Sequence, residues 1–266
     1  MKFLIQTEEE TGIPITDMGL AILRGEQFRE WFHNELPDVT MIEEHMALTP
    51  EQRTMVCDNL AVPIGTVQWT QEAVGVTIKP LNIPRQYWSK PYFVSRPCKG
   101  NLCHSQLEKE LVNGPLFVKS ATQCKAWAPV IAKNVADVPA DKLYFATAPT
   151  NFRAEWRAFI YRNKVMDVRR YAGDWWMDKA ISREWIEAVC SEGDFSAHTI
   201  DFGLNDAGAL DLIEVHPFIA CGLYGFEDYD VIRKMALLAW HGFLAAQTMK
   251  YGWQPLPQKL RSMSDD

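Results

Sequence analysis

The chain has 266 residues, of which 47% are hydrophobic and 23% are charged, and its formal net charge is −7. This length allows one large domain or two modest ones, and the composition is ordinary for a globular protein with a sizeable core. The acidic balance excludes a general basic field for duplex nucleic acid, and no run approaches the roughly 18 apolar residues of a membrane span. The six cysteines form no C-x-x-C pair, so we expect free thiols and a cytoplasmic protein.

The first third of the chain alternates strand-like and helical patterns. Residues 2–6 predict a strand, and the apolar spacing over residues 17–32 predicts a helix. Thr49 as N-cap, followed by Pro50, indicates the start of a second helix. Four prolines between residues 80 and 97 favour an extended connector. We therefore predict a domain boundary there.

The rest of the chain is dominated by strand patterns. Short strands are predicted over residues 116–119 and 143–148, and residues 155–171 alternate as an antiparallel hairpin around a turn at residues 162–163. Residues 182–191 predict a helix with Ser182 as its N-cap, and residues 228–249 predict a final helix rich in Leu, Ala and Met.

The most informative stretch runs from His198 to Pro217. It reads as two apolar strands around the turn Asn205-Asp206-Ala207-Gly208. Pairing centred on this turn places Asp201 opposite Leu212, with Glu214 as its diagonal neighbour, roughly 7 Å away or less. Alternation assigns one face to the core and the other to polar residues. The predicted core face holds Ile200, Phe202, Leu204, Ile213 and Val215, and the other face holds Asp201, Leu212, Glu214 and His216.

The polar face of this hairpin offers candidate metal ligands. Asp201, Glu214 and His216 place two carboxylates and an imidazole together, a set that would repel or stay idle without a cation. Carboxylate oxygens at this separation suit Mg²⁺, which usually takes one or two carboxylates together with substrate phosphates. The alternative is a solvated hairpin face with ordinary acids.

Basic residues on the preceding strands form a second candidate set. Lys119 ends a strand and is followed by small residues and by Lys125, an arrangement that could hold phosphate oxygens; the alternative is a lysine that reaches to solvent. Glu155 and Arg157 share a strand face, and Arg169 lies on the hairpin partner. Arginine presents a planar fork that suits phosphate or carboxylate. The alternative here is a cross-strand ion pair on a wet face.

Several common catalytic motifs are absent from the sequence. It has no G-x-x-x-x-G-K-[ST], no G-x-G-x-x-G, no G-x-S-x-G and no H-E-x-x-H. These absences argue against a Walker-type NTPase, a dinucleotide enzyme, an α/β-hydrolase and a zinc protease of that type.

The order of the candidate motifs resembles the ATP-grasp superfamily, especially small phage- and bacteria-borne members thought to be peptide or amide ligases. The likeness covers about residues 94–225. In chain order its motifs are Phe117-Val118-Lys119, the strand over 143–148, Glu155-Trp156-Arg157, Asp201-Phe202-Gly203-Leu204 and Leu212-Ile213-Glu214-Val215-His216-Pro217.

The resemblance implies roles for the cations and the hinge. Lys119 and Lys125 correspond to lysines that contact ATP phosphates, the second from the lid, and Arg157 corresponds to the arginine beside the β- and γ-phosphates. Arg169 joins Lys119 and Arg157 as a candidate catalytic cation, and Glu155 is a candidate nucleotide contact. The hinge that receives adenine, largely through backbone groups, corresponds to Leu143, Tyr144, Phe145, Ala146 and Thr147.

The resemblance also implies a metal site, with one departure. Asp201 and Glu214 match the acids that hold Mg²⁺. His216 occupies a third position that is usually Asn, and imidazole is a softer ligand than an amide oxygen. The lid over residues 120–127 is a further departure because it contains no glycine.

We therefore expect an α/β (α+β) protein: a small N-terminal α/β domain over residues 1–92 and an ATP-grasp domain over residues 93–266, whose two subdomains sandwich ATP. The implied activity is an ATP- and Mg²⁺-dependent carboxylate–amine ligase that forms an amide or peptide bond through an acyl phosphate. Its substrates would be a small-molecule or peptide carboxylate and an amine, in the host cytoplasm if the chain is phage-encoded. A kinase using the same site and a non-catalytic nucleotide-binding module stay open as alternatives.

Overall fold

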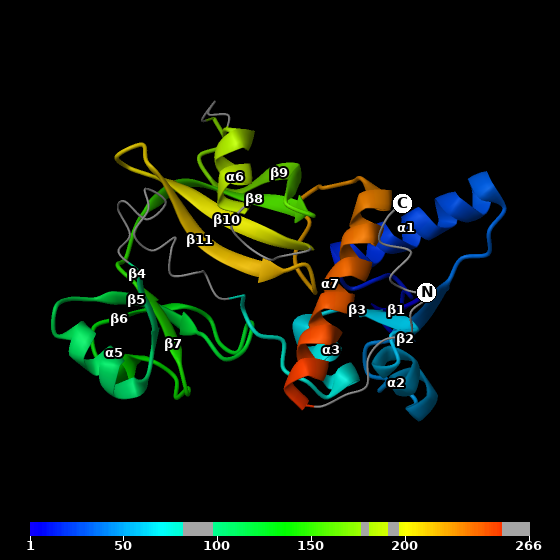
Figure 1. Cartoon of the computed structure of the whole chain (residues 1–266), viewed down its shortest axis with the longest axis horizontal. Coiled ribbons are helices and arrows are strands. Elements are labelled where there is room, and N and C mark those ends of the chain that lie inside the picture. The colour runs from blue at the N-terminus through cyan, green and yellow to red at the C-terminus, as the bar shows by residue number, and fades with distance from the viewer. Residues whose placement is uncertain (82–97, 177–180, 191–196, 252–266) are drawn as a thin grey trace. The chain divides into compact units, whose positions relative to one another are not determined.

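The computed structural model describes residues 1–81, 98–176, 181–190 and 197–251. The chain divides into two compact units (Figure 1). The first comprises Met1–Val76, Phe218–Leu223 and Glu227–Asp266, and the second comprises Thr77–Pro217 and Tyr224–Phe226. The boundary predicted between residues 92 and 93 lies outside the described residues. The first unit also takes in the C-terminal helix, which we had predicted to belong to the second domain.

The first unit is a small α/β structure around a parallel sheet of order β2-β1-β3. Phe3, Leu4 and Ile5 of the central strand are all buried, as expected for a parallel strand covered on both faces. The carboxylate of Glu26 ties two helices together, since it accepts a hydrogen bond from Arg233 at 2.7 Å. The elements of this unit are β1 (Lys2–Thr7), α1 (Asp17–His33), β2 (Val39–Glu43), α2 (Pro50–Cys57), β3 (Ala61–Ile64), α3 (Val67–Val74) and α7 (Tyr229–Tyr251).

Helix caps form where the sequence predicts them. The Thr49 hydroxyl accepts from the backbone N–H of Gln52, and the Gln52 side chain accepts from the backbone of Thr49, which completes a capping box. Among the described residues, no helix combines the length and the apolar character that a membrane span requires.

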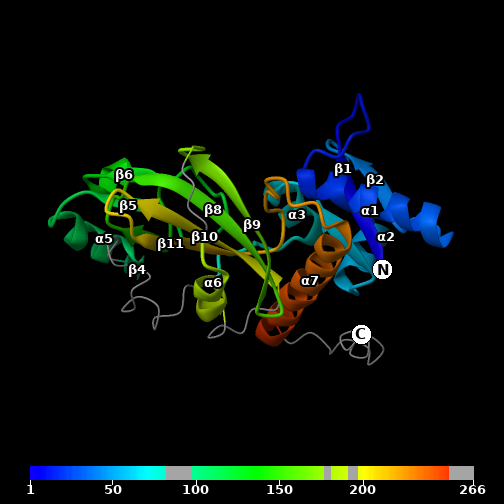
Figure 2. The ribbon, with the colours of Figure 1, turned by 90° about the horizontal axis from the view of Figure 1, so that it is seen from above.

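The second unit contains two four-stranded antiparallel sheets (Figures 1 and 2). One has the order β4-β7-β5-β6, and the other has the order β11-β10-β8-β9. The elements are β4 (Cys98–Leu102), α5 (His104–Leu111), β5 (Leu116–Ser120), β6 (Val130–Ala132), η2 (Val135–Asp137), β7 (Tyr144–Thr147), β8 (Phe152–Tyr161), β9 (Lys164–Gly173), α6 (Arg183–Cys190), β10 (Ala197–Asn205) and β11 (Leu210–Pro217).

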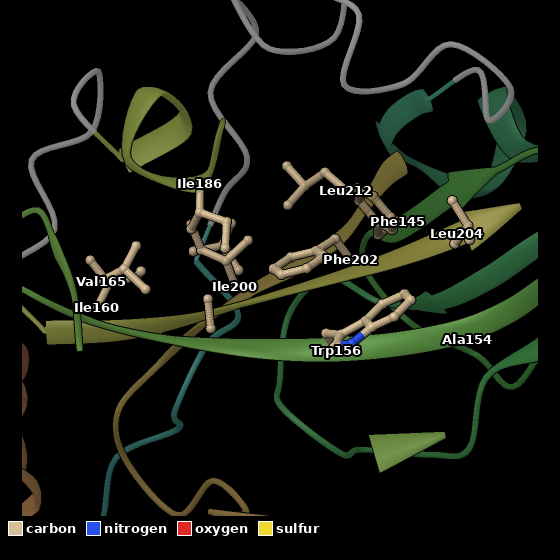
Figure 3. Close-up of a cluster of buried hydrophobic side chains, with 12 residues drawn as sticks. Phe145, Ala154, Trp156, Ile160, Val165, Ile186, Ile200, Phe202, Leu204 and Leu212 are labelled. Atoms are coloured by element: carbon tan, nitrogen blue, oxygen red, sulfur yellow. The ribbon is translucent and has the colours of Figure 1, made fainter. Parts of the chain in front are cut away.

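One face of the β11-β10-β8-β9 sheet carries the main core of the second unit (Figure 3). Trp156 and Phe202 stack on neighbouring strands with their ring centroids 6.4 Å apart, and Ile186 of α6 packs on the same cluster. Phe145 of β7 joins this cluster from the other sheet. The opposite face of the strands carries the charged side chains Arg157, Asp201 and Glu214, together with the buried Phe159.

The hairpin of β10 and β11 differs from its predicted register. The pairing is shifted by one residue from the turn onward, so that Phe202 lies opposite Leu212. The extra residue Ile213 then forms a bulge in β11, which adds a second shift and sets Asp201 directly opposite Glu214. The predicted pairing of Asp201 with Leu212 is therefore wrong, and Leu212 belongs to the buried core. A turn forms at the predicted residues, with Gly208 at a φ of 80° and its N–H donating to the carbonyl oxygen of Asn205 at 3.0 Å. Its centre differs by half a residue from the predicted one, because Leu204 pairs with Leu210 rather than with Ala209.

Candidate functional site

A row of four charged side chains crosses the β11-β10-β8-β9 sheet on the face opposite its apolar cluster. The strand pairing sets Arg169 opposite Arg157, Arg157 opposite Asp201, and Asp201 opposite Glu214. Directly opposed residues on antiparallel strands bring their Cβ atoms to about 4.5–5.5 Å. The backbone ladders, rather than flexible loops, thus hold these charges side by side.

The inner half of the row is a buried ion pair. Arg157 donates from Nε to Oδ1 of Asp201 and from Nη2 to Oδ2, both at 2.7 Å. The two residues are only 7% and 3% exposed. This two-point contact between the planar guanidinium and the carboxylate is among the strongest hydrogen-bonding arrangements available to side chains.

The outer half of the row joins the two sheets of the second unit. Lys119, at the end of β5, donates a hydrogen bond from Nζ to Oε2 of Glu214 on β11. Arg157 Nη2 lies 3.9 Å from the other carboxylate oxygen of Glu214, and Lys119 Nζ lies 5.2 Å from the centre of the Phe145 ring. The Glu214 side chain is 30% exposed, so this half of the row is accessible to solvent.

The two acids differ in their ionisation. Burial raises the pKa of Asp201 to about 6, in spite of the opposing effect of Arg157. Burial would also raise the pKa of Glu214, but Lys119 and His216 together hold it at about 2. Near neutral pH both groups are therefore carboxylates, which is the form that a cation requires.

Aromatic side chains and a further acid surround Arg157. The rings of Tyr171 and Tyr224 stack with their centroids 4.9 Å apart, and the guanidinium carbon of Arg157 lies 5.9 Å and 5.0 Å from them. The Tyr171 hydroxyl donates to Oε2 of Glu155 at 2.7 Å, and burial raises the pKa of that phenol. The sequence analysis did not identify either tyrosine. Tyr171 is the extra residue of a bulge in β9, and Tyr224 lies on a distant segment with no local signal.

Comparison with known protein families shows the family of this chain. Residues 98–234 match the family described as ATP-grasp domain, R2K clade family 2. The chain belongs to this ATP-grasp family. The matched range contains every residue that the sequence analysis assigned to the site.

Several solved structures resemble this ATP-grasp protein remotely. The RimK-domain ATP-grasp protein from Sphaerobacter thermophilus is 8% identical with a TM-score of 0.46, over 92% of this chain and 99% of that chain. The ATP-grasp ligase PsnB, complexed with a minimal precursor, is 11% identical with a TM-score of 0.45, over 88% and 99%. The D-alanine–D-alanine ligase from Coxiella burnetii is 10% identical with a TM-score of 0.43, over 95% and 97%. No curated protein matches the sequence.

The strand predicted as the adenine hinge of the ATP-grasp fold is an inner strand. In β7, Tyr144 to Thr147 pair with β4 on one side and with β5 on the other. Two ladders engage the backbone N–H and C=O groups of such a strand. Leu143 precedes the strand and is partly exposed. Contacts to a base through the strand's own backbone would thus compete with sheet hydrogen bonds.

The segment that follows Lys119 is fixed by side-chain hydrogen bonds. The Ser120 hydroxyl accepts from the backbone N–H groups of Thr122 and Gln123, both at 3.2 Å, and the Thr122 hydroxyl donates to Asp141 at 2.6 Å. These bonds define the turn in place of the glycines that many ATP-grasp lids contain. Lys125 is exposed and has a φ of 52°.

His216 lies on the same face as the two acids but is held by its own bond. It is opposite Thr199, one position beyond the Asp201–Glu214 pair on that face, and its Nδ1 donates to the carbonyl oxygen of Pro217 at 2.9 Å. Burial lowers the pKa of His216, so the ring is neutral near pH 7. Asp201, Glu214 and His216 do not bring three potential ligand atoms within 4.8 Å of one another. Among the described residues, one group of metal-ligating side chains does so, namely Glu9, Glu43 and His45, which are all exposed in the first unit.

Arg169 stands at the outer end of the row. It lies on β9, an outer strand of the sheet, and its side chain is 42% exposed. Its Nε donates to Asp167 at 2.6 Å. The strand pairing thus places Arg169 next to Arg157, and it is the more accessible of the two.

Proposed function

We propose that this ATP-grasp protein is an ATP- and Mg²⁺-dependent carboxylate–amine ligase that forms an amide or peptide bond through an acyl phosphate. The observation that carries the proposal is the charged row together with Lys119, in which the two neighbouring acids Asp201 and Glu214 are each bonded to a cation, Arg157 for the first and Lys119 for the second. Phosphoryl transfer needs charge neutralisation and positioning more than it needs a protein nucleophile. A site rich in paired charges suits that requirement.

Asp201 and Glu214 fit the proposed Mg²⁺ site by their chemistry. Hard carboxylate oxygens are the ligands that Mg²⁺ prefers, and one or two of them are enough when phosphates complete the coordination. Their placement directly opposite each other is closer than the diagonal pairing that the sequence predicted. Bound Mg²⁺ would neutralise charge on the phosphates of ATP. We propose His216 as a neighbour that supports Glu214, or as a third ligand through its Nε2.

Lys119 and Arg157 are the proposed phosphate contacts. In the structure each donates to one of the acids, so the four groups neutralise one another. A nucleotide phosphate competes with the acids for the two cations, while a metal competes with the cations for the two acids. An exchange of partners would therefore let ATP and the metal enter together. Lys125 and Glu155 are proposed to line the same nucleotide site, and Arg169 is proposed to face the reacting group.

The proposed reaction proceeds in two balanced steps. A substrate carboxylate oxygen attacks the γ-phosphorus of ATP, the bond from that phosphorus to the bridging oxygen breaks, and ADP leaves. An amine then attacks the acyl carbon, phosphate leaves, and the nitrogen loses a proton to give the amide. Arg157 and Lys119 would hold the phosphate oxygens in line during the first step.

The adenine position follows from the pairing of β7. Because Tyr144 to Thr147 are engaged on both sides, we propose that adenine contacts their side chains and the segment that follows Thr147, rather than the strand's backbone. Leu143 and Phe145 are the proposed apolar contacts, since one is partly exposed and the other lies beside Lys119.

Two other functions are alternatives to the ligase, and the experiments described below distinguish them from it. A kinase would use the same phosphate contacts but transfer the phosphoryl group to a hydroxyl. A nucleotide-binding module without turnover is favoured by one observation, the histidine at a position that is usually Asn.

The first experiment is a thermal-shift panel of ATP, ADP and GTP with and without Mg²⁺. A nucleotide at 100 times its dissociation constant should stabilise the protein by about 2.7 kcal/mol. The second combines ATP and Mg²⁺ with pools of carboxylates and amines, followed by mass spectrometry. A ligase yields condensed amides together with ADP and phosphate, and a kinase yields phosphorylated products. Absence of nucleotide stabilisation in the wild type would refute the proposal.

A further inference from the structure

Tyr224 reaches the charged row from outside the sheet. It belongs to the three-residue segment Tyr224–Phe226, which packs with the second unit although the chain on either side belongs to the first. The Phe226 ring packs on Phe159 with centroids 4.7 Å apart, and the Tyr224 ring lies 5.0 Å from the guanidinium carbon of Arg157. This short segment is thus anchored at one end and contacts Arg157 at the other.

The backbone of this segment adopts a conformation that costs energy. Tyr224 has a φ of 50° and Gly225 has a φ of 86°. A bulky residue in the left-handed region is uncommon and is retained where the surrounding structure holds it there. What holds Tyr224 is the stack on Tyr171, whose hydroxyl is itself fixed by Glu155. Ring against ring and ring against guanidinium are thus two of the contacts that fix its position.

The contact with Arg157 is of the cation–π kind. A guanidinium within about 6 Å of a ring centroid is attracted to the face of the ring, more strongly where water is excluded. Arg157 is buried, and its fork already points at Asp201. A ring on its flank restricts the tilt of the guanidinium plane without occupying its N–H donors.

We propose that Tyr224 is a positioning residue that aligns the Arg157 guanidinium for a phosphate, and that it acts through its ring rather than its hydroxyl. The proposal rests on the phosphate role proposed for Arg157. It adds to the nucleotide site a residue that lies outside the motifs of the sequence analysis.

The test uses three variants and a matched control. Tyr224→Phe keeps the ring, whereas Tyr224→Asn removes the ring but tolerates the left-handed backbone. Tyr161→Leu is the control, because the ring of Tyr161 lies 5.4 Å from Arg162 on the same sheet, outside the charged row. Arg157→Lys keeps the charge but lacks the planar fork. The affinity of each protein for the non-hydrolysable ATP analogue AMP-PNP with Mg²⁺ is measured by calorimetry, and unfolding in urea reports stability.

Tyr224→Asn should weaken binding of the analogue by about two- to thirty-fold, the range expected for loss of a cation–π contact. Tyr224→Phe and Tyr161→Leu should bind like the wild type. In the Arg157→Lys background, the further change Tyr224→Asn should cost less than about twofold, since neighbouring residues that act through one another are not additive.

Three outcomes would overturn the inference. They are wild-type affinity in Tyr224→Asn, weakened affinity in Tyr224→Phe, or equal losses from Tyr224→Asn in both backgrounds. Any of these, with normal binding by the wild type, leaves the proposed function standing. Failure of the wild type to bind any nucleotide refutes the proposed function, and the inference with it.

Discussion

The Arg157–Asp201 and Lys119–Glu214 ion pairs differ in their surroundings, although their acids lie opposite each other on neighbouring strands. Arg157 and Asp201 are buried and share two hydrogen bonds, whereas Lys119 bonds to a Glu214 that is 30% exposed. A buried charge that loses its partner cannot recover solvation, but an accessible one can. We infer that the inner pair contributes more to the folded structure, and that the outer pair can exchange partners at lower cost.

The largest effect is expected from breaking the inner pair. Asp201→Asn should lower the free energy of unfolding by about 3–5 kcal/mol, because it removes the carboxylate that shares two hydrogen bonds with the buried Arg157 and leaves only the more distant Glu214 as a counter-ion. Urea denaturation measures the loss. The double change Arg157→Met with Asp201→Leu should recover most of it, since apolar residues of similar volume often replace a buried ion pair without loss. If Asp201→Asn changes the free energy of unfolding by less than about 1 kcal/mol, the inner pair stabilises the protein no more than an ordinary surface ion pair does.

Breaking the outer pair should change the affinity of the protein for ATP. Glu214→Gln should tighten the binding of ATP in excess EDTA by up to about fivefold, equivalent to roughly 1 kcal/mol, because Lys119 no longer has a competing acid. The same variant should lose most of the gain in affinity that Mg²⁺ gives to the wild type. Calorimetry with and without Mg²⁺ measures both.

The control for this prediction is Glu187→Gln. Glu187 bonds to Arg183 at 2.8 Å on α6, an exposed pair away from the row. The Glu187→Gln change should leave the affinity for ATP unchanged, both with and without Mg²⁺. Weaker binding of metal-free ATP in Glu214→Gln would show that the outer pair does not compete with the nucleotide.

A smaller effect is expected in how the free energy of unfolding changes at acidic pH. The pKa of Glu214 is held at about 2, below its ordinary value, so its contribution is present above the ordinary pKa and is lost as the pH falls toward 2. The free energy of unfolding of the wild type should therefore fall more steeply below about pH 4.5 than that of Glu214→Gln. Parallel profiles for the two proteins would contradict the depressed pKa.

The smallest effect on stability is expected at the outer end of the row. Arg169→Gln removes a partly exposed pair with Asp167 and should change the free energy of unfolding by less than about 1 kcal/mol. If Arg169 faces the reacting group, turnover should fall while the affinity for AMP-PNP with Mg²⁺ stays constant. Equal losses of turnover in Arg169→Gln and Asp167→Asn would instead indicate a structural role for the pair.

Alternation along the chain was enough to find the acids of the site but not their pairing. Parity correctly placed Asp201 and Glu214 on one face, since a strand has a period of two. It failed at Leu212, because the pairing is shifted by one residue at the turn and by another at the Ile213 bulge, and nothing in the local sequence marks either shift.

Contacts between distant segments were also beyond the sequence. Lys119 meets Glu214 across 95 positions of the chain, and Tyr224 reaches Arg157 from a turn that no motif predicts. The helical spacing of Phe28, Trp31 and Phe32 correctly predicted a helix, yet all three side chains are exposed, because α1 buries residues such as Met18 and Ile22 instead. Periodicity identifies an element without saying which partner covers it.

The bulge at Ile213 also bears on the exposed edge of its sheet. Deleting Ile213 would restore plain alternation and leave Leu212 and Glu214 on their present faces. It would also straighten β11, which is an outer strand of its sheet. Straight outer strands present unpaired backbone groups on which another chain can add a strand, and bulges are one device that prevents this. The extra residue is thus expected to protect against self-association, so its deletion should cause aggregation before it alters the arrangement of the charged row.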